Sequence, residues 1–291
     1  MGKKIKALIF TALVMLLLLI IISVGQAIVM MPDMITLMGE GLMGQELMET
    51  LYAKEGLMAN GQFVGEVFAI LILGIWYYRG YVKKDKEAGT YVKVTKKFEN
   101  KFNILFVLCL IFFGSAIAYI VYTLTDMAIP STVDAVDEML GGIAGNVLGL
   151  LAIFIGAPFS EELALRGIVM QKTKKAFGLV GCVLISGIAF GIIHANIVQF
   201  LYALSLGAVF GYIAYKFDSV IPTIIGHAIH NTLGGMIFGL IGIPGEIAIA
   251  VVTCVGIFLT YKKVTFPAEK LADSDVADSV AEQNEEIFAE E

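Results

Sequence analysis

Long apolar segments alternate with short polar ones over most of this 291-residue chain. A bilayer core of roughly 30 Å requires about 20 apolar residues per helix, and several segments come close to that length. Their approximate ranges are 6–30, 61–79, 103–124, 142–166, 178–195, 199–216, 219–240 and 245–261. The pattern therefore predicts an all-α, polytopic membrane bundle of about eight transmembrane helices.

Composition supports the same class. Hydrophobic residues make up 58% of the chain and charged residues only 16%, whereas soluble domains carry about 25% charged residues. The net charge of −6 is concentrated in the acidic tail 265–291, without which the chain is slightly basic. The tail contains few aromatic residues and is predicted to be disordered. The charge balance thus indicates no nucleic-acid partner, and the expected surroundings are the lipid bilayer.

Lysine and arginine positions predict the orientation of the spans. If the N-terminus is cytoplasmic and the spans alternate, every basic residue except Lys54 falls on the cytoplasmic side, including those of the loop 79–102. The outer loop 126–140 contains acids and no base. We expect a multi-pass protein of a prokaryotic plasma membrane, with both termini in the cytoplasm, because no organelle signal is evident.

Three regions follow from this topology. Residues 1–140 form an N-terminal transmembrane region with three spans, 141–264 form a core of about five spans, and 265–291 form the tail. In the outer segment 32–60, apolar residues are spaced as in an amphipathic surface helix. These residues are Leu37, Met38, Leu42, Leu47, Met48 and Leu51. Oligomeric state is left open.

Small residues recur at helical spacing in two of the later spans. Gly207 and Gly211 are four residues apart, as are Gly235 and Gly239. This spacing is typical of close helix packing in lipid.

Charge is unusual inside the apolar segments and is a hypothesis for function where it occurs. Pro158 lacks a backbone N–H, so in a membrane helix it leaves a carbonyl that needs another partner. Ser160 is a candidate cap for a helix that restarts at Glu161. Glu162 and Arg166 are four residues apart and can pair on one helix face, from which Glu161 is absent. We therefore expect Arg166 to hold Glu162, and Glu161 to face another partner.

These charges alone also fit the ordinary cytoplasmic end of a span. The histidines change that interpretation, because all three in the chain, His194, His227 and His230, follow this stretch. Phe190 and His194 share one helix face, as do His227 and Asn231. Glu66, in the second span, lies nearer the outer end, which favours a solvated or structural role over catalysis.

This set of side chains contains the groups needed to hydrolyse an amide. A carboxylate can accept a proton from water and later donate it to a leaving amine, and a neutral imidazole can share that work. A second imidazole and a side-chain amide can stabilise a developing oxyanion. The sequence shows no convincing serine or cysteine nucleophile with a matched base, and no H-E-x-x-H pair.

Three motifs on successive spans resemble those of the CPBP intramembrane proteases, the CAAX-protease and bacteriocin-processing family, also called the Abi family. They are E-E-x-x-x-R, F-x-x-x-H and H-x-x-x-N, matched here by Glu161, Glu162 and Arg166, by Phe190 and His194, and by His227 and Asn231. Each motif is weak alone, but their order and spacing make the set specific. The resemblance covers about residues 140–240.

The resemblance implies an intramembrane endopeptidase whose site opens toward the cytoplasm and whose substrate is a membrane-associated peptide or protein. It implies that Glu161 and His194 activate the attacking water, and that His227 and Asn231 form the oxyanion hole. Glu162, Arg166 and Phe190 then support the site. For His194 to reach the depth of the other residues, we expect the helix around Lys172–Leu179 to project beyond the lipid.

Alternatives remain at this point. Glu161, His194 and His227 can in principle bind zinc, which takes nitrogen and oxygen ligands. We favour the metal-free glutamate mechanism because no short-spaced ligand pair is present and Asn231 suits an oxyanion better than zinc. Outside catalysis, the chain can be a non-proteolytic scaffold, sensor or immunity protein of the same fold. A proton-coupled transporter ranks last, because only one break in a helix is clear.

Overall fold

A computed structural model describes residues 2–233 and 239–267, and in these ranges the chain is helical without strands. This confirms the predicted all-α, polytopic membrane bundle. The helices are α1 (Lys3–Gly39), α2 (Gly44–Tyr52), α3 (Leu57–Tyr77), α4 (Lys83–Glu87), α5 (Val94–Lys97), α6 (Lys101–Ala128), α7 (Pro130–Ala144), α8 (Val147–Leu151), α9 (Ala157–Glu162), α10 (Met170–Ile192), α11 (Ile197–Phe217), α12 (Ile221–Leu233) and α13 (Gly239–Tyr261). Three π-helical segments adjoin them: η1 (Tyr78–Val82), η2 (Ala152–Gly156) and η3 (Leu163–Val169). The tail 268–291 and the pair Gly235–Gly239 cannot be judged, since their placement or side chains lie outside the described residues.

Within the described ranges, six helical stretches are long and apolar enough to cross a membrane, against about eight expected. The fourth and fifth predicted spans run together in one stretch, Val147–Ile192. The backbone turns inside it at Gly178, where φ is 65° and ψ is −165°, values that glycine adopts without steric cost. The seventh predicted span contains α12, of which 13 residues lie in the described part of the chain. The difference thus lies in length and continuity, and the order of the predicted spans is retained.

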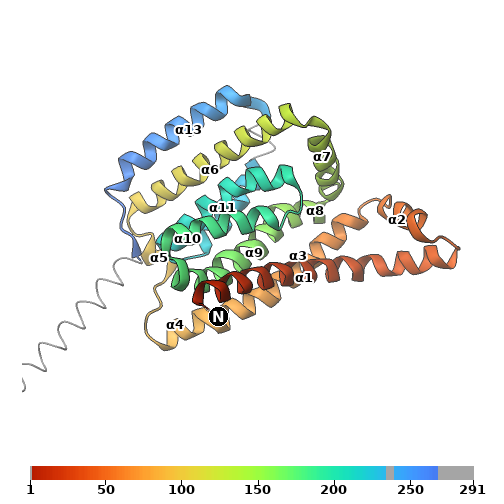
Figure 1. Ribbon diagram of the computed structural model, residues 1–291, viewed down its shortest axis with the longest axis horizontal. Helices are drawn as coiled ribbons and strands as arrows, with labels where there is room; N and C mark the ends of the chain where they lie inside the picture. Colours follow the sequence, from red (N-terminus) through yellow and green to blue (C-terminus); the bar gives the residue numbers. More distant parts are fainter. Residues whose placement is uncertain (1, 234–238, 268–291) are drawn as a thin grey trace, which may run out of the picture.

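The two ends of the bundle differ in charge. One end, here called the basic end, holds the N-terminus, α4, α5 and the junction between α11 and α12 (Figure 1). The other, here called the acidic end, holds α2 and α7 (Figure 1). Lysines from distant parts of the sequence meet at the basic end: Lys4 lies over the Phe177 ring and Lys172 over the Phe10 ring. The segregation follows the predicted orientation, whereas the projection of Lys172–Leu179 beyond the lipid stays a prediction.

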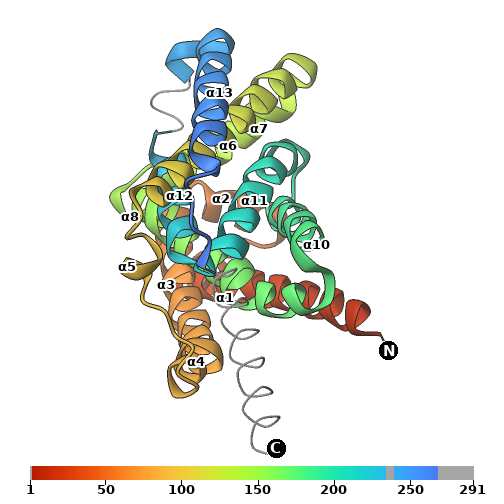
Figure 2. The same ribbon diagram turned by 90° about the vertical axis from the view of Figure 1, so that its left-hand side faces the viewer.

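Long helices pair on opposite sides of the bundle. Helices α1 and α3 run antiparallel along one side, and α13 lies along α6 on the other (Figures 1 and 2). A Cβ atom on Gly25 of α1 would lie 2.4 Å from the Cα atom of Gly65 in α3, so only glycine permits this approach. Gly207 of α11 also lies close to α10, because its Cβ atom would lie 2.8 Å from the Gly187 Cα atom. The close packing predicted for the Gly207–Gly211 pair is thereby confirmed.

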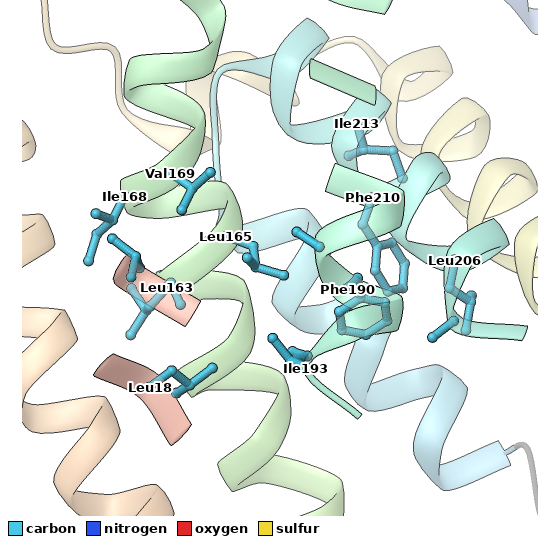
Figure 3. Packing of buried hydrophobic residues seen from close by; sticks show 14 of the residues in the cluster. Leu18, Leu163, Leu165, Ile168, Val169, Phe190, Ile193, Leu206, Phe210 and Ile213 are labelled. Carbon is cyan, nitrogen blue, oxygen red and sulfur yellow. The ribbon is translucent and has the colours of Figure 1, made fainter. Parts of the chain in front are cut away.

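The central core lies where η3, α10 and α11 meet. Figure 3 shows Leu165 of η3 pointing toward the Phe190 and Phe210 rings, whereas Leu163 and Ile168 point to the other side of the helix, where Leu18 of α1 lies. These side chains are at least nine-tenths buried. Their burial fixes the positions of η3 and α10, which carry Arg166, Phe190 and His194, against α11.

The outer segment 32–60 does not form one surface helix. Helix α1 continues through Pro32 to Gly39, and α2 folds back as a separate nine-residue helix. Of the six predicted apolar positions, Leu37, Leu47 and Leu51 are buried against each other, whereas Met38 and Met48 are exposed. The amphipathic pattern therefore predicted correctly that the leucines pack together.

Three charged side chains, Asp218, Lys174 and Lys97, form ion pairs at the basic end and are here called the charged clamp. Asp218 follows α11 with φ at 46°, and its carboxylate accepts a hydrogen bond from Lys174 Nζ at 2.6 Å. Lys97 Nζ lies 3.5 Å from the same carboxylate and also donates to the Asp218 backbone carbonyl. Burial raises the pKa of the Asp218 carboxyl, but the attraction of Lys174 and Lys97 outweighs it, so the pKa is below its ordinary value. The clamp therefore contributes stability above the ordinary aspartate pKa of about 3.9 and loses it as pH falls through the lower folded-state pKa.

We predict that Asp218→Asn lowers the melting temperature of the purified protein at pH 7 by roughly 2–5 °C, as measured by scanning fluorimetry in detergent. Asparagine tolerates the left-handed backbone, so the loss reports charge. The matched control is Glu87→Gln, whose exposed partner Lys83 lies 3.6 Å away and which should change little. The difference between wild type and Asp218→Asn should shrink below about pH 4. A difference that is absent at pH 7, or that persists in acid, would contradict this account.

Candidate active site

Pro158 shapes the helix that carries the acids. In the π-helical segment η2, the carbonyl of Ile153 would bond to the N–H five residues on, which is residue 158. Proline has no N–H, so this carbonyl needs another donor. Asn231 Nδ2 of α12 supplies it at 2.8 Å. The sequence predicted a carbonyl without a helical partner, and the structure shows that a motif residue from another helix pairs with it.

The helix does not break at Pro158, however, and Ser160 is not its cap. The helical path is continuous from η2 through α9 to η3, because the wider π turns accommodate the proline. Ser160 Oγ instead donates to Glu66 Oε2 at 2.5 Å, and Gln62 Nε2 donates to Glu66 Oε1 at 2.7 Å. Glu66 is 1% exposed, so the expectation of a solvated side chain is wrong and a structural role fits.

Glu162 and Arg166 form the predicted ion pair, with Arg166 Nη1 donating to Glu162 Oε1 at 2.8 Å. Both side chains are completely buried. Arg166 Nη2 also donates to the Gly207 carbonyl at 2.9 Å. The guanidinium carbon lies 4.8 Å from the centroid of the Phe190 ring and 5.6 Å from that of Phe210, distances typical of cation–π contacts. The pair thus joins η3 to α10 and α11.

His227 connects this buried pair to Glu161. Its Nδ1 lies 3.2 Å from Glu162 Oε1, and its Nε2 lies 3.9 Å from Glu161 Oε2. Because an ionised carboxylate can only accept, Nδ1 carries a proton and the Nε2 edge faces Glu161. The Glu161 side chain is 15% exposed, and its Oε2 atom has no hydrogen-bond partner. The two adjacent glutamates therefore have different surroundings, as their angular separation predicted.

His194 contacts the same Phe190 ring as His227. The centroid of the Phe190 ring is 5.1 Å from that of His194 and 5.3 Å from that of His227. His194 Nδ1 lies 2.7 Å from the Phe190 carbonyl oxygen. Since a carbonyl only accepts, Nδ1 carries the proton, and Nε2 keeps a lone pair in the neutral ring. No hydrogen bond or ion pair joins Glu161 and His194 in the described residues, so His227 is the imidazole in closer contact with Glu161.

One cavity of about 830 Å³ brings the predicted residues together. Among its lining residues are Glu161, Phe190, His194, His227 and Asn231. Glu162 and Arg166 lie behind its wall.

The cavity extends toward the acidic end, where α7 and the first part of α13 line it. No lysine or arginine is among its lining residues. This placement differs from the expectation of a site open toward the cytoplasm, since the lysine-rich end is the one predicted to be cytoplasmic.

His230 also lines the cavity but turns away from Glu161. Its Nδ1 lies 3.1 Å from Ser115 Oγ of α6, and its ring packs on Tyr119 at 5.4 Å. Of the two positions that the sequence left open, the structure favours the flanking one, since His230 lines the same cavity as His227 and Asn231.

The three side chains that the sequence offered as zinc ligands all line the cavity. Over residues 2–233 and 239–267, no three histidine, cysteine, aspartate or glutamate side chains are grouped so that they could hold a metal ion. Among the possible ligands, the Nδ1 atoms of His194 and His227 already face an acceptor. Their Nε2 atoms are left available, an arrangement in which a histidine can also ligate a metal.

Comparison with protein-family models gives one match, to type II CAAX prenyl endopeptidase Rce1-like, over residues 143–233. The match supports the predicted resemblance to the CPBP/CAAX protease family. The matched residues, here called the CAAX protease segment, contain every residue of the three motifs and coincide closely with the range of the predicted resemblance, although they cover less than half of the chain. No curated protein and no solved structure matched the chain.

The CAAX protease segment does not supply the whole cavity wall. Gln62, Tyr119, Asp137 and Glu246 line the cavity from α3, α6, α7 and α13, outside residues 143–233. Sequence reasoning missed Glu246, although an acid near the start of an apolar span is itself a signal. It also missed the Gly207 carbonyl, because backbone acceptors leave no trace in residue type.

We predict that the buried Glu162–Arg166 pair responds differently to single and to double substitution. Glu162→Gln or Arg166→Met alone leaves a buried charge without its partner and should cost about 3–5 kcal/mol of unfolding free energy. The double variant removes both charges and should lose clearly less than the sum of the two singles. Chemical unfolding in mixed micelles measures these values.

A double variant whose loss equals that sum would contradict the coupling. Lys83→Met with Glu87→Gln serves as the matched control for an exposed pair, for which all three variants should remain close to wild type.

Proposed function

We propose that the chain is a CAAX-type intramembrane endopeptidase that hydrolyses a peptide bond of a membrane-associated peptide or protein. The family match over residues 143–233 supports the class. The observation that carries the mechanism is the unequal state of the two glutamates. Glu162 is buried in an ion pair, whereas Glu161 faces His227 Nε2 in a cavity large enough for a peptide segment.

In the proposed mechanism, Glu161 accepts the proton of the attacking water. His194 assists from its Nε2 edge, because its Nδ1–H is held by the Phe190 carbonyl. The carbon–nitrogen bond of the substrate then breaks as the same groups return a proton to the leaving amine. Water enters through the cavity, which both side chains line.

His227 and Asn231 stabilise the oxyanion that develops on the substrate carbonyl. Asn231 carries two N–H bonds, and one is used by the Ile153 carbonyl, which leaves one for the substrate. His227 is oriented by Glu162 through Nδ1. The proton that Glu161 takes from the water is shared with Nε2 of His227, 3.9 Å away, and from there it is donated to the oxyanion before it returns to the leaving amine. Such preorganised donors in a water-poor site contribute strongly to amide hydrolysis.

We further propose that this protease is of the glutamate type and works without zinc, in a prokaryotic plasma membrane with the basic end in the cytoplasm. The amide of Asn231, which suits an oxyanion better than zinc, supports the metal-free assignment. In this orientation the substrate reaches the cavity from the opposite, acidic end.

We predict that Glu161→Gln reduces cleavage at least about 100-fold, because general acid–base catalysis contributes on the order of 10²–10⁴-fold. The purified protein in liposomes would be incubated with a library of membrane-associated peptides, and products identified by mass spectrometry. His194→Ala should lose activity to a similar degree. Glu138→Gln, an exposed acid on α7 that does not line the cavity, should cleave at the wild-type rate.

Three outcomes would replace this proposal. Equal cleavage by wild type and Glu161→Gln refutes the catalytic assignment. Loss of cleavage with a chelator and recovery with zinc would favour the zinc-dependent protease instead. If no member of a broad library is cleaved by well-folded wild type, the non-proteolytic scaffold or immunity protein of the same fold is favoured.

A further inference from the structure

Glu246 is a buried acid that the proposed mechanism does not use. It lies in the first half of α13, in the apolar stretch Leu240–Tyr261. The residue is 2% exposed, and its Oε2 atom is buried without a hydrogen-bond partner. No ion pair reaches it from the described part of the chain. Its side chain lines the same cavity as Glu161 and His227.

The packing of α13 on α6 holds Glu246 in this place. One turn further along α13, the buried Ala250 packs against Ala116 of α6. Small residues bring the two helices together, which directs the preceding turn of α13 toward the cavity. The position of Glu246 is therefore set by the packing of its own helix, outside the CAAX protease segment.

The cavity as a whole is suited to positive charge. Its lining includes the carboxylates of Asp137, Glu161 and Glu246, and no lysine or arginine. Asp137 is exposed on α7, where it accepts a hydrogen bond from the Tyr122 hydroxyl at 2.6 Å. The carboxylates of Asp137 and Glu246 thus stand on the acidic-end side of the catalytic groups.

Burying an ionised carboxylate in apolar surroundings costs free energy, because the charge is removed from water. Only a partner of opposite charge and hydrogen bonds offset that cost. Ionisable residues within membrane segments accordingly mark sites of substrates or ions. The described residues offer Glu246 no such partner, but a ligand in the cavity can.

We propose that Glu246 is a specificity subsite that binds a basic side chain, lysine or arginine, of the substrate peptide. The ammonium or guanidinium group pairs with the Glu246 carboxylate while the peptide lies in the cavity between α7, α12 and α13. Asp137 attracts the same charge at the exposed rim. This inference rests on the proposed function for the identity of the ligand as a substrate, but binding can be tested without cleavage.

The test measures binding to full-length protein carrying Glu161→Gln, which prevents turnover. The probes are capped, fluorescent, otherwise uncharged apolar peptides with one lysine at successive positions, each paired with a norleucine peptide of the same length. For at least one position, the lysine peptide should bind about tenfold tighter than its norleucine partner, as for other buried charge pairs. Adding Glu246→Gln should abolish the preference, and adding Glu138→Gln should leave it intact.

If Glu246→Gln folds poorly, a second variant tests the same subsite. Glu246→Lys, in the same background, should reverse the preference toward glutamate peptides. Equal binding of lysine and norleucine peptides at every position overturns the subsite, as does a lysine preference that survives in Glu246→Gln. If wild type cleaves none of the peptides but the Glu246-dependent preference is present, the proposed protease fails and the cation subsite stands.

Discussion

The buried ion pair between Glu162 and Arg166 is the interaction on which the site depends. The pair lies fully out of solvent. Removing two charges from water costs free energy, which only good geometry between the partners can offset. Four contacts supply that geometry: the Gly207 carbonyl, His227 Nδ1 and the rings of Phe190 and Phe210. Because these partners come from α10, α11 and α12, satisfying one ion pair places three helices around Glu161.

A second constraint comes from the backbone. The π turns around Pro158 keep the helix continuous while leaving the Ile153 carbonyl to Asn231. This single bond joins η2 to α12 and fixes the amide that the proposed mechanism uses. The proline does not break the helix. Its missing N–H leaves a carbonyl that holds Asn231, a motif residue from another helix, in position. Glu66 and Ser160 attach α3 to the same turn, so the N-terminal region also supports the site.

The sequence predicted the helical class, the order of the spans and the grouping of the motif residues, because hydropathy and i, i+4 spacing are local properties. It separated Glu161 from Glu162 for the same reason. It did not predict the continuity of Val147–Ile192, since whether a proline breaks or widens a helix depends on partners elsewhere. The burial of Glu66, the role of the Gly207 carbonyl and the direction of the cavity depend on tertiary contacts. The spacing of residue types along the chain does not reveal such contacts.

The account's central claim is that one of two adjacent glutamates faces the reacting peptide while the other holds the fold. Carbodiimide labelling of the native protein, read by mass spectrometry, tests this directly, because it modifies carboxyl groups that reagents can reach. The account predicts that Glu161 is modified and is protected by a bound peptide, whereas Glu162 is modified only after unfolding. Equal modification of both glutamates in the native protein, or labelling of Glu162 before Glu161, would contradict it.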